Sequence, residues 1–199
     1  MNLAVITLPD CFEGETSLVN SLFFHGLGKL HLRKPGAGKE MLSDWIREIR
    51  PEYRKRIVLH DHHDLAREFS LGGIHLNGRN PEVPEWLDRK VFTVSRSCHS
   101  IQEIRENLAD CDSLFLSPVF DSISKEGYGA AFSPEVLRDA ASKQIIDYKV
   151  VALGGIEASH INALKEWHFG GAAFLGDIWN RINDKDVDAY LDHLRQLLK

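Results

Sequence analysis

Residues 149–179, KVVALGGIEASHINALKEWHFGGAAFLGDIW, contain the pattern that decides the fold. A short β-branched apolar run opens this stretch at Lys149, and a second run begins at Ala172. Between the two runs, apolar residues recur at helical spacing, which predicts a helix over 159–168. A strand, a helix and a strand without a long linker are typical of two parallel strands joined by a helical crossover.

The same alternation extends along the whole chain and predicts eight strands. Gly, Asn, Asp, Ser or Pro bounds each apolar run, as expected of strands. Eight repeats in 199 residues favour a small (βα)₈ TIM barrel forming a single compact domain over 1–199. An open doubly wound sheet is less favoured, because no GxGxxG follows the first strand. The runs are LAVIT from Leu3, KLHLR from Lys29, RIVLHD from Arg56, GIHLN from Gly73, VFTVS from Val91, SLFLSPVF from Ser113, KVVALGG from Lys149 and AAFLGDIW from Ala172.

Capping residues mark where several helices begin. Ser100 with Glu103 forms a capping box, and Ser133 precedes a proline at the first helical position. We expect Asp64 to cap the helix that contains LAREF, and a short helix over 82–87. The clearest predicted helices are 39–50, 100–109, 133–144, 159–168 and 187–199.

Composition and charge narrow the class of protein. The chain is 27% charged and 43% hydrophobic with a net charge of −5, as expected of a globular protein that binds neither nucleic acid nor a membrane. No apolar run approaches the roughly 18 residues that span a bilayer. Three cysteines without a CxxC pair fit a reducing compartment, so we expect a cytoplasmic protein.

Polar segments follow the predicted strands, and a barrel would bring these strand ends to one rim. Their cations, hydroxyls, glycines and carboxylates indicate a site for phosphorylated ligands that a metal helps to hold. The glycines of ALGGI and LGD follow strands seven and eight, where barrels form phosphate cups from backbone N–H groups. We expect a locally cationic mouth made of Arg33, Lys34, Arg79, Arg96 and Lys125.

These strand-end segments resemble the motifs of the thiamine phosphate synthase and TenI superfamily in order and spacing. The segments KLHLRKP, HDHHDLA, GGIHLNG, SRSCH, SPVFDSISKEG, VVALGGI and GGAAFLGDIW match the family patterns QLRxK, NDxxDLA, GVHLGQxD, GxSxH, GPVFxTxTK, VxAIGGI and GxAVxSxI. The resemblance covers nearly the whole chain. It implies a thiamine phosphate synthase, a transferase that joins hydroxymethylpyrimidine diphosphate to thiazole phosphate, releases diphosphate and uses Mg²⁺.

The resemblance also implies a role for individual residues. Arg33 and Lys125 would clamp the diphosphate, and Asp61 would be the first Mg²⁺ ligand, with Asn80 at the position of the second. The remaining assignments are to substrate binding: Ser97 beside the pyrimidine, Ser122 and Ser124 in place of family threonines, and Gly155, Gly176 and Asp177 at the thiazole phosphate.

Several positions depart from the family pattern and leave alternatives open. The family Gln is His31, the Asn before the metal carboxylate is His60, and a lysine is Pro35. A TenI-like thiazole tautomerase would need a base, for which His31, His60 or His99 has a suitable unperturbed pKa of about 6.5. A third hypothesis is that the chain is a catalytically silent relative that binds a phosphate ligand. Finally, His60 and His62 have the i, i+2 spacing with which some barrel hydrolases bind a divalent metal.

Overall fold

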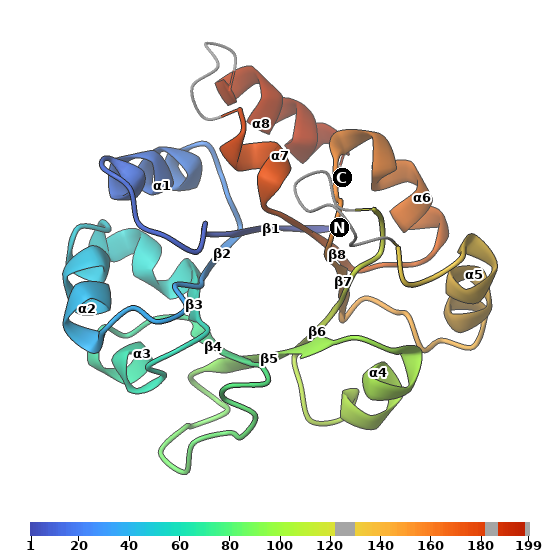
Figure 1. The fold of residues 1–199 in the computed structure, drawn as a ribbon, viewed down its shortest axis with the longest axis horizontal. Helices are drawn as coiled ribbons and strands as arrows, with labels where there is room; N and C mark the ends of the chain where they lie inside the picture. The colour runs from blue at the N-terminus through green and yellow to red at the C-terminus, as the bar shows by residue number, and fades with distance from the viewer. Residues whose placement is uncertain (122–129, 182–186, 198–199) are drawn as a thin grey trace. The chain divides into compact units, whose positions relative to one another are not determined.

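A computed structural model describes residues 1–121, 130–181 and 187–197. Its eight strands are hydrogen-bonded in chain order and form a closed barrel (Figure 1), which confirms the predicted (βα)₈ fold. Each of the eight predicted runs overlaps a strand. The strands are β1 (Asn2–Ile6), β2 (Lys29–Leu32), β3 (Ile57–Leu59), β4 (Gly73–Leu76), β5 (Thr93–Cys98), β6 (Ser113–Leu116), β7 (Val150–Ala152) and β8 (Gly171–Phe174).

Helices follow most of the strands, and none of those in the described ranges is both long enough and apolar enough to span a membrane. The helices are α1 (Glu15–Phe24), α2 (Lys39–Arg47), α3 (Asp64–Glu68), α4 (Ile101–Asn107), α5 (Pro134–Ser142), α6 (Ile161–Glu166), α7 (Gly176–Trp179) and α8 (Val187–Leu197), with 3₁₀ turns η1 (Pro51–Arg56) and η2 (Ala158–His160).

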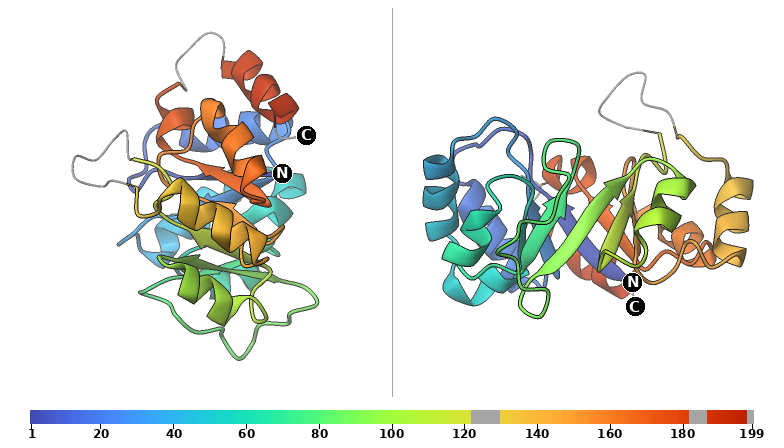
Figure 2. Two further views of the ribbon diagram at one scale, coloured as in Figure 1. Left: turned by 90° about the vertical axis from the view of Figure 1, so that its right-hand side faces the viewer. Right: turned by 90° about the horizontal axis from the view of Figure 1, so that it is seen from below.

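The chain divides into two compact units, one of residues 5–94 and one of residues 1–4 with 95–199. In the first unit, β2, β3 and β4 pair in parallel, with His31 opposite Val58 and Leu59 opposite Ile74. Helices α1, α2 and α3 lie on the outer side of these strands (Figures 1 and 2). Every residue of β3 and β4 is buried, as expected when a parallel sheet is covered on both faces. The expectation of one domain over 1–199 stays a prediction.

In the second unit, β5 to β8 form a parallel ladder. Phe115 of β6 lies opposite Ser97 on one side and Val151 on the other. Helices α4, α5 and α6 lie outside these strands (Figures 1 and 2). Both predicted caps are confirmed: the side chains of Ser100 and Ser133 accept the backbone N–H of the residue three positions later.

Two local predictions are wrong. No helix forms over 82–87; that segment is a series of turns, because Pro81 and Pro84 interrupt any helical hydrogen-bond ladder. Asp64 does not cap α3, since the N-cap is His63 and Asp64 is the first helical residue. The Asp64 carboxylate instead pairs with Lys39 at the start of α2.

A buried ion pair joins the end of β2 to α1 and α2. Lys34 Nζ lies 2.6 Å from Glu15 Oε1, and each side chain is only 1% exposed. Lys34 also donates to the carbonyl of Asp10, and Trp45 Nε1 donates to Glu15 Oε2 at 3.0 Å. The placement of Lys34 in a cationic mouth is therefore wrong. Side chains alternate between the two faces of a strand, so Lys34 is directed away from the face that carries Arg33.

We expect Glu15→Gln to lower the free energy of unfolding by about 3–5 kcal/mol, because it leaves the Lys34 ammonium buried without its counter-ion. Chemical denaturation of the two proteins measures the difference. The double variant Glu15→Leu/Lys34→Met should recover most of the loss, since both charges are then absent. Equal stability of Glu15→Gln and wild type would contradict this account.

Candidate functional site

Arg33, the first residue after β2, is held by its backbone. Its N–H donates to Thr7 Oγ1 at 2.9 Å, and the Thr7 hydroxyl donates back to the Arg33 carbonyl at 3.0 Å. The guanidinium is only partly exposed. Burial lowers the pKa of Arg33 and nearby Arg79 lowers it further, while Asp61 acts in the opposite direction. Arg33 therefore lies within the electrostatic reach of both residues.

Asp61, two residues beyond β3, accepts hydrogen bonds on both carboxylate oxygens. Arg79 binds it in a bidentate manner, with Nε 3.0 Å from Oδ1 and a terminal nitrogen 2.9 Å from Oδ2. The Asn80 amide donates to the same Oδ1 at 2.9 Å. The structure thus brings together three residues that the sequence analysis placed at strand ends, namely Arg33, Asp61 and Asn80, and adds Arg79 as the partner of Asp61.

Asn77 organises this group and was not singled out from the sequence. Its side-chain oxygen accepts the backbone N–H groups of Arg79 and Asn80, and its amide donates to the His60 carbonyl at 3.0 Å. Asn77 and Asn80 also exchange two backbone hydrogen bonds of 3.1 Å. The Asn-Gly pair at 77–78 is a strong turn signal and could have identified this residue.

A cavity of about 570 Å³ opens beside Asp61. Its walls are residues 61–64 and 79–82, together with Pro84 and Trp86. The Arg67 guanidinium lies over the Trp86 ring, 5.5 Å from its centroid. The cavity therefore combines three carboxylates, an arginine and an amide with an aromatic wall, which suits a small polar ligand.

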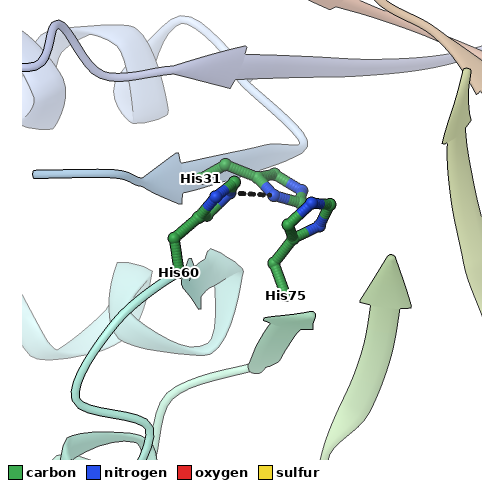
Figure 3. A group of neighbouring side chains, drawn as sticks. All are labelled: His31, His60 and His75. Carbon is green, nitrogen blue, oxygen red and sulfur yellow. Dashed lines mark hydrogen bonds between the residues drawn. The ribbon is translucent and has the colours of Figure 1, made fainter. Parts of the chain in front are cut away.

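Three histidines from neighbouring strands converge on one another (Figure 3). His31 lies on β2, His75 on β4, and His60 directly follows β3. His31 Nδ1 lies 3.1 Å from His60 Nε2, and the rings of His60 and His75 stack with centroids 4.1 Å apart. All three side chains are buried. The sequence analysis considered His31 and His60 as separate bases, and the structure makes them a hydrogen-bonded pair.

Burial sets the protonation of this pair. The pKa values of His31 and His60 lie well below the usual 6.5, first because burial disfavours the charged ring and then because His75 lies beside both. Lys29 adds to the effect on His31, and Arg33 and Arg79 add to the effect on His60. Both rings are therefore neutral at pH 7.

The remaining histidines of this loop, His62 and His63, and the third candidate base, His99, have surroundings of their own. His62 Nε2 lies 2.9 Å from the Ala37 carbonyl, so His60 and His62 do not converge on one metal as their i, i+2 spacing suggested. His63 is buried, and burial lowers its pKa. His99 is exposed, with Nδ1 3.1 Å from the Ser117 carbonyl.

The remaining predicted residues belong to the second unit. Ser97 lies on β5 and is partly exposed. Asp177 is buried, and its carboxylate accepts from Arg181 at 3.1 Å and from the Tyr190 hydroxyl, so it joins α7 to α8. Gly176 begins α7, where the first N–H groups have no partner within the helix. Ser122, Ser124 and Lys125 lie outside the described residues.

The glycine pair after β7 has a packing role. Gly154 and Gly155 have φ of 92° and 62°, values that side chains disfavour. A Cβ on Gly155 would lie 2.2 Å from the Asp121 carbonyl oxygen. Phe120 also donates its N–H to the Gly154 carbonyl at 3.1 Å. The pair therefore lets the turn after β7 pack against the backbone that follows β6.

Known proteins match this chain over most of its length. A profile of the thiamine monophosphate synthase family, TMP-TENI, matches residues 3–178. The chain belongs to this family. A thiamine-phosphate synthase of Haemophilus influenzae is 30% identical over 187 residues, which are 90% of this chain and 79% of the relative. One from Syntrophomonas wolfei is 26% identical over 98% of this chain and 95% of the relative.

A solved structure gives the same result. The crystal structure of a thiamine phosphate pyrophosphorylase from Bacteroides thetaiotaomicron superposes with a TM-score of 0.87 and 37% identity, covering 99% of this chain and 97% of that one. The family resemblance read from the strand-end motifs is confirmed.

Two of the positions at which this chain differs from the thiamine monophosphate synthase motifs are in contact with each other. His31 stands where the motif has Gln and His60 where it has Asn, and the structure pairs these two side chains directly. The two departures therefore belong together, because each ring supplies the hydrogen-bond partner of the other in a buried place.

This pair predicts how stability depends on pH. The unfolded histidines have pKa values near 6.5 and the folded ones lie well below, so the unfolded state binds protons first as the pH falls. Stability is therefore full above about pH 7 and is lost below about pH 6.5, by up to about 2 kcal/mol per histidine at pH 5.

Denaturant unfolding at pH 7.5 and pH 5 measures this effect. The double variant His31→Gln/His60→Asn carries the side chains of the family motif and should lose less stability over the same interval. Parallel stability curves for the variant and the wild type would show that neither histidine is held neutral by the fold.

Proposed function

We propose that this chain is a thiamine phosphate synthase, a transferase of thiamine biosynthesis that joins hydroxymethylpyrimidine diphosphate to thiazole phosphate. The observation that carries the proposal is the group formed by Arg33, Asp61, Arg79 and Asn80 at the ends of β2, β3 and β4. In a member of the thiamine monophosphate synthase family, this group combines two cations for an anionic ligand with one carboxylate for a metal.

The reaction requires the protein to position and stabilise charge. The bond between the pyrimidine methylene carbon and the diphosphate oxygen breaks, and the electron pair leaves with the diphosphate. The thiazole nitrogen then donates its lone pair to the cationic carbon. Arg33 is placed to stabilise the charge on the departing oxygens, and a charge-assisted hydrogen bond of this kind contributes about 1.5–3 kcal/mol.

Oxygen ligands for Mg²⁺ are present in the same group. Mg²⁺ is commonly bound by one or two carboxylates together with substrate phosphates. Asp61 supplies one carboxylate, and the Asn80 amide nitrogen, rather than its oxygen, faces that carboxylate at 2.9 Å. Asp61 would therefore hold the ion together with the diphosphate, and Asn80 would be a ligand only after its amide turns over. When bound, Mg²⁺ would neutralise part of the diphosphate charge. Arg79 contacts both Asp61 oxygens, so Arg79 and the ion compete for this carboxylate.

The second unit supplies the remaining proposed contacts. The family resemblance assigns the thiazole phosphate to backbone amides of Gly155, Gly176 and Asp177. Because the Asp177 carboxylate is already bound by Arg181 and Tyr190, its contribution would come from the main chain alone. Ser97 beside the pyrimidine, and Ser122, Ser124 and Lys125, keep the roles that the resemblance gives them.

The direct test is formation of thiamine phosphate from the two substrates with Mg²⁺. We expect Arg33→Ala to lower kcat/KM by about 10- to 150-fold, the equivalent of one charge-assisted hydrogen bond. Arg47→Ala is the matched control, because Arg47 is an exposed arginine on α2 whose ion-pair partner in the described part of the chain is the exposed Asp44. No product from the wild type at high enzyme concentration would overturn the proposal.

The same assay separates the alternatives. Incubation with the unisomerised thiazole carboxylate phosphate tests the tautomerase, for which the neutral His31–His60 pair is the specific structural feature. Turnover there that is lost in His60→Asn, without any synthase activity, would replace the proposal. Binding of either phosphate without turnover would identify a silent relative.

Competition for Asp61 predicts the effect of Arg79→Gln on the metal requirement. The half-saturating Mg²⁺ concentration for the synthase reaction should fall about 2- to 5-fold, because an ion pair worth up to about 1 kcal/mol no longer opposes the metal. Titration of activity with Mg²⁺ measures this shift, and Arg89→Gln, an exposed arginine beyond the cavity, is the control. An unchanged or higher requirement in Arg79→Gln would contradict the competition.

A further inference from the structure

We propose that His31, His60 and His75 bind one divalent transition-metal ion of the zinc type through their ring nitrogens. The proposed site is distinct from the oxygen ligands of Asp61 and Asn80, and it does not depend on the synthase activity. It lies entirely within residues 5–94 and uses side chains that the transfer reaction leaves without a role (Figure 3).

The ring nitrogens of the three histidines lie close together. One nitrogen from each of the three rings lies within 4.8 Å of the other two, and His31 Nδ1 and His60 Nε2 are 3.1 Å apart. Nitrogens bound to one tetrahedral zinc ion are about 3.3 Å apart, given metal–nitrogen bonds of about 2.0–2.1 Å. Ring rotations of modest size, chiefly of His75 out of its stack on His60, are therefore enough to form the site.

Three imidazoles and no carboxylate favour borderline ions such as Zn²⁺ or Co²⁺ over Mg²⁺ and Ca²⁺, which prefer oxygen. Three protein ligands also leave a fourth position for water or a ligand. A metal binds the neutral form of the imidazole ring, so binding should weaken as the pH falls.

The surrounding backbone and side-chain amides support His60. The His60 N–H donates to the Leu32 carbonyl at 3.2 Å, which continues the β2–β3 ladder one residue beyond β3. The His60 carbonyl accepts the side-chain amides of both Asn77 and Asn80 at 3.0 Å. The ligand from the loop is therefore held as firmly as the two from strands, which is the preorganisation a metal site needs.

Access comes from the His60 side. His60 is followed by Asp61 and is 4% exposed, whereas His31 and His75 are each 1% exposed. Residues 61–64 line the 570 Å³ cavity, so the cavity wall begins at the residue that follows His60, and we infer that an ion enters there. We expect slow loading, and the experiment must allow for it.

The test uses the full chain after treatment with a chelator. Addition of Co²⁺ at pH 7.5 should produce visible d–d absorption that saturates at one equivalent and is displaced by Zn²⁺. Excess Zn²⁺ at about 100 times its Kd should raise the Tm by about 5–10 °C. Mg²⁺ at the same concentration should produce neither change.

Variants assign the signal to the three rings. His31→Gln and His60→Asn should each remove the Co²⁺ band and the Tm shift, whereas His62→Asn should keep both. His62 is a matched control, because it lies two residues from His60 but its ring contacts the Ala37 carbonyl. Its φ of 50° is one that Asn tolerates well.

Several outcomes would overturn the proposal. These are absence of a stoichiometric Co²⁺ signal in the wild type, equal binding in His31→Gln and His62→Asn, or X-ray absorption of the zinc-loaded wild type that fits fewer than three imidazoles. The last measurement needs no variant, so a variant that fails to fold leaves the proposal testable. All of these readouts are independent of thiamine phosphate formation, so failure of the metal site and failure of the synthase assignment are distinguishable.

Discussion

The parallel hydrogen-bond ladder that joins β2, β3 and β4 positions the polar groups of the first unit. Its register places His31 opposite Val58 and Leu59 opposite Ile74, so the residues after each strand emerge next to one another. Arg33, His60 and Asp61 depend on this register for their neighbours. A shift by one residue would exchange the two faces of the strand and would place Arg33 where Lys34 is buried with Glu15.

Local patterns were enough to predict the fold and part of the site. Apolar runs with β-branched residues identified every strand, and side-chain caps at Ser100 and Ser133 identified two helix starts, because both signals are contained in a few consecutive residues. The placement of Arg33, Asp61 and Asn80 near one another followed from the rule that parallel strands share one carboxyl edge. The family assignment followed from motifs located at these same edges.

The contacts that were not predicted join side chains from segments far apart in the chain. The sequence of a single segment does not indicate such contacts. The contact between His31 and His60 joins residues 29 positions apart, and the bidentate pairing of Arg79 with Asp61 depends on a turn built by Asn77. Lys34 was expected at the mouth because it lies just after a strand, but the alternation of side chains directs it to the opposite face from Arg33. The helix expected over 82–87 did not form, because Pro84 lies within the segment and Pro81 directly before it.

The turns between β4 and β5 have a thermodynamic consequence for ligand binding. Pro81 and Pro84 line the cavity, and each restricts φ in the free chain. Loops usually lose conformational freedom when they close on a ligand, and this loss opposes binding. Here much of that entropy is already lost on folding, so this wall offers a ligand a surface that needs little further ordering.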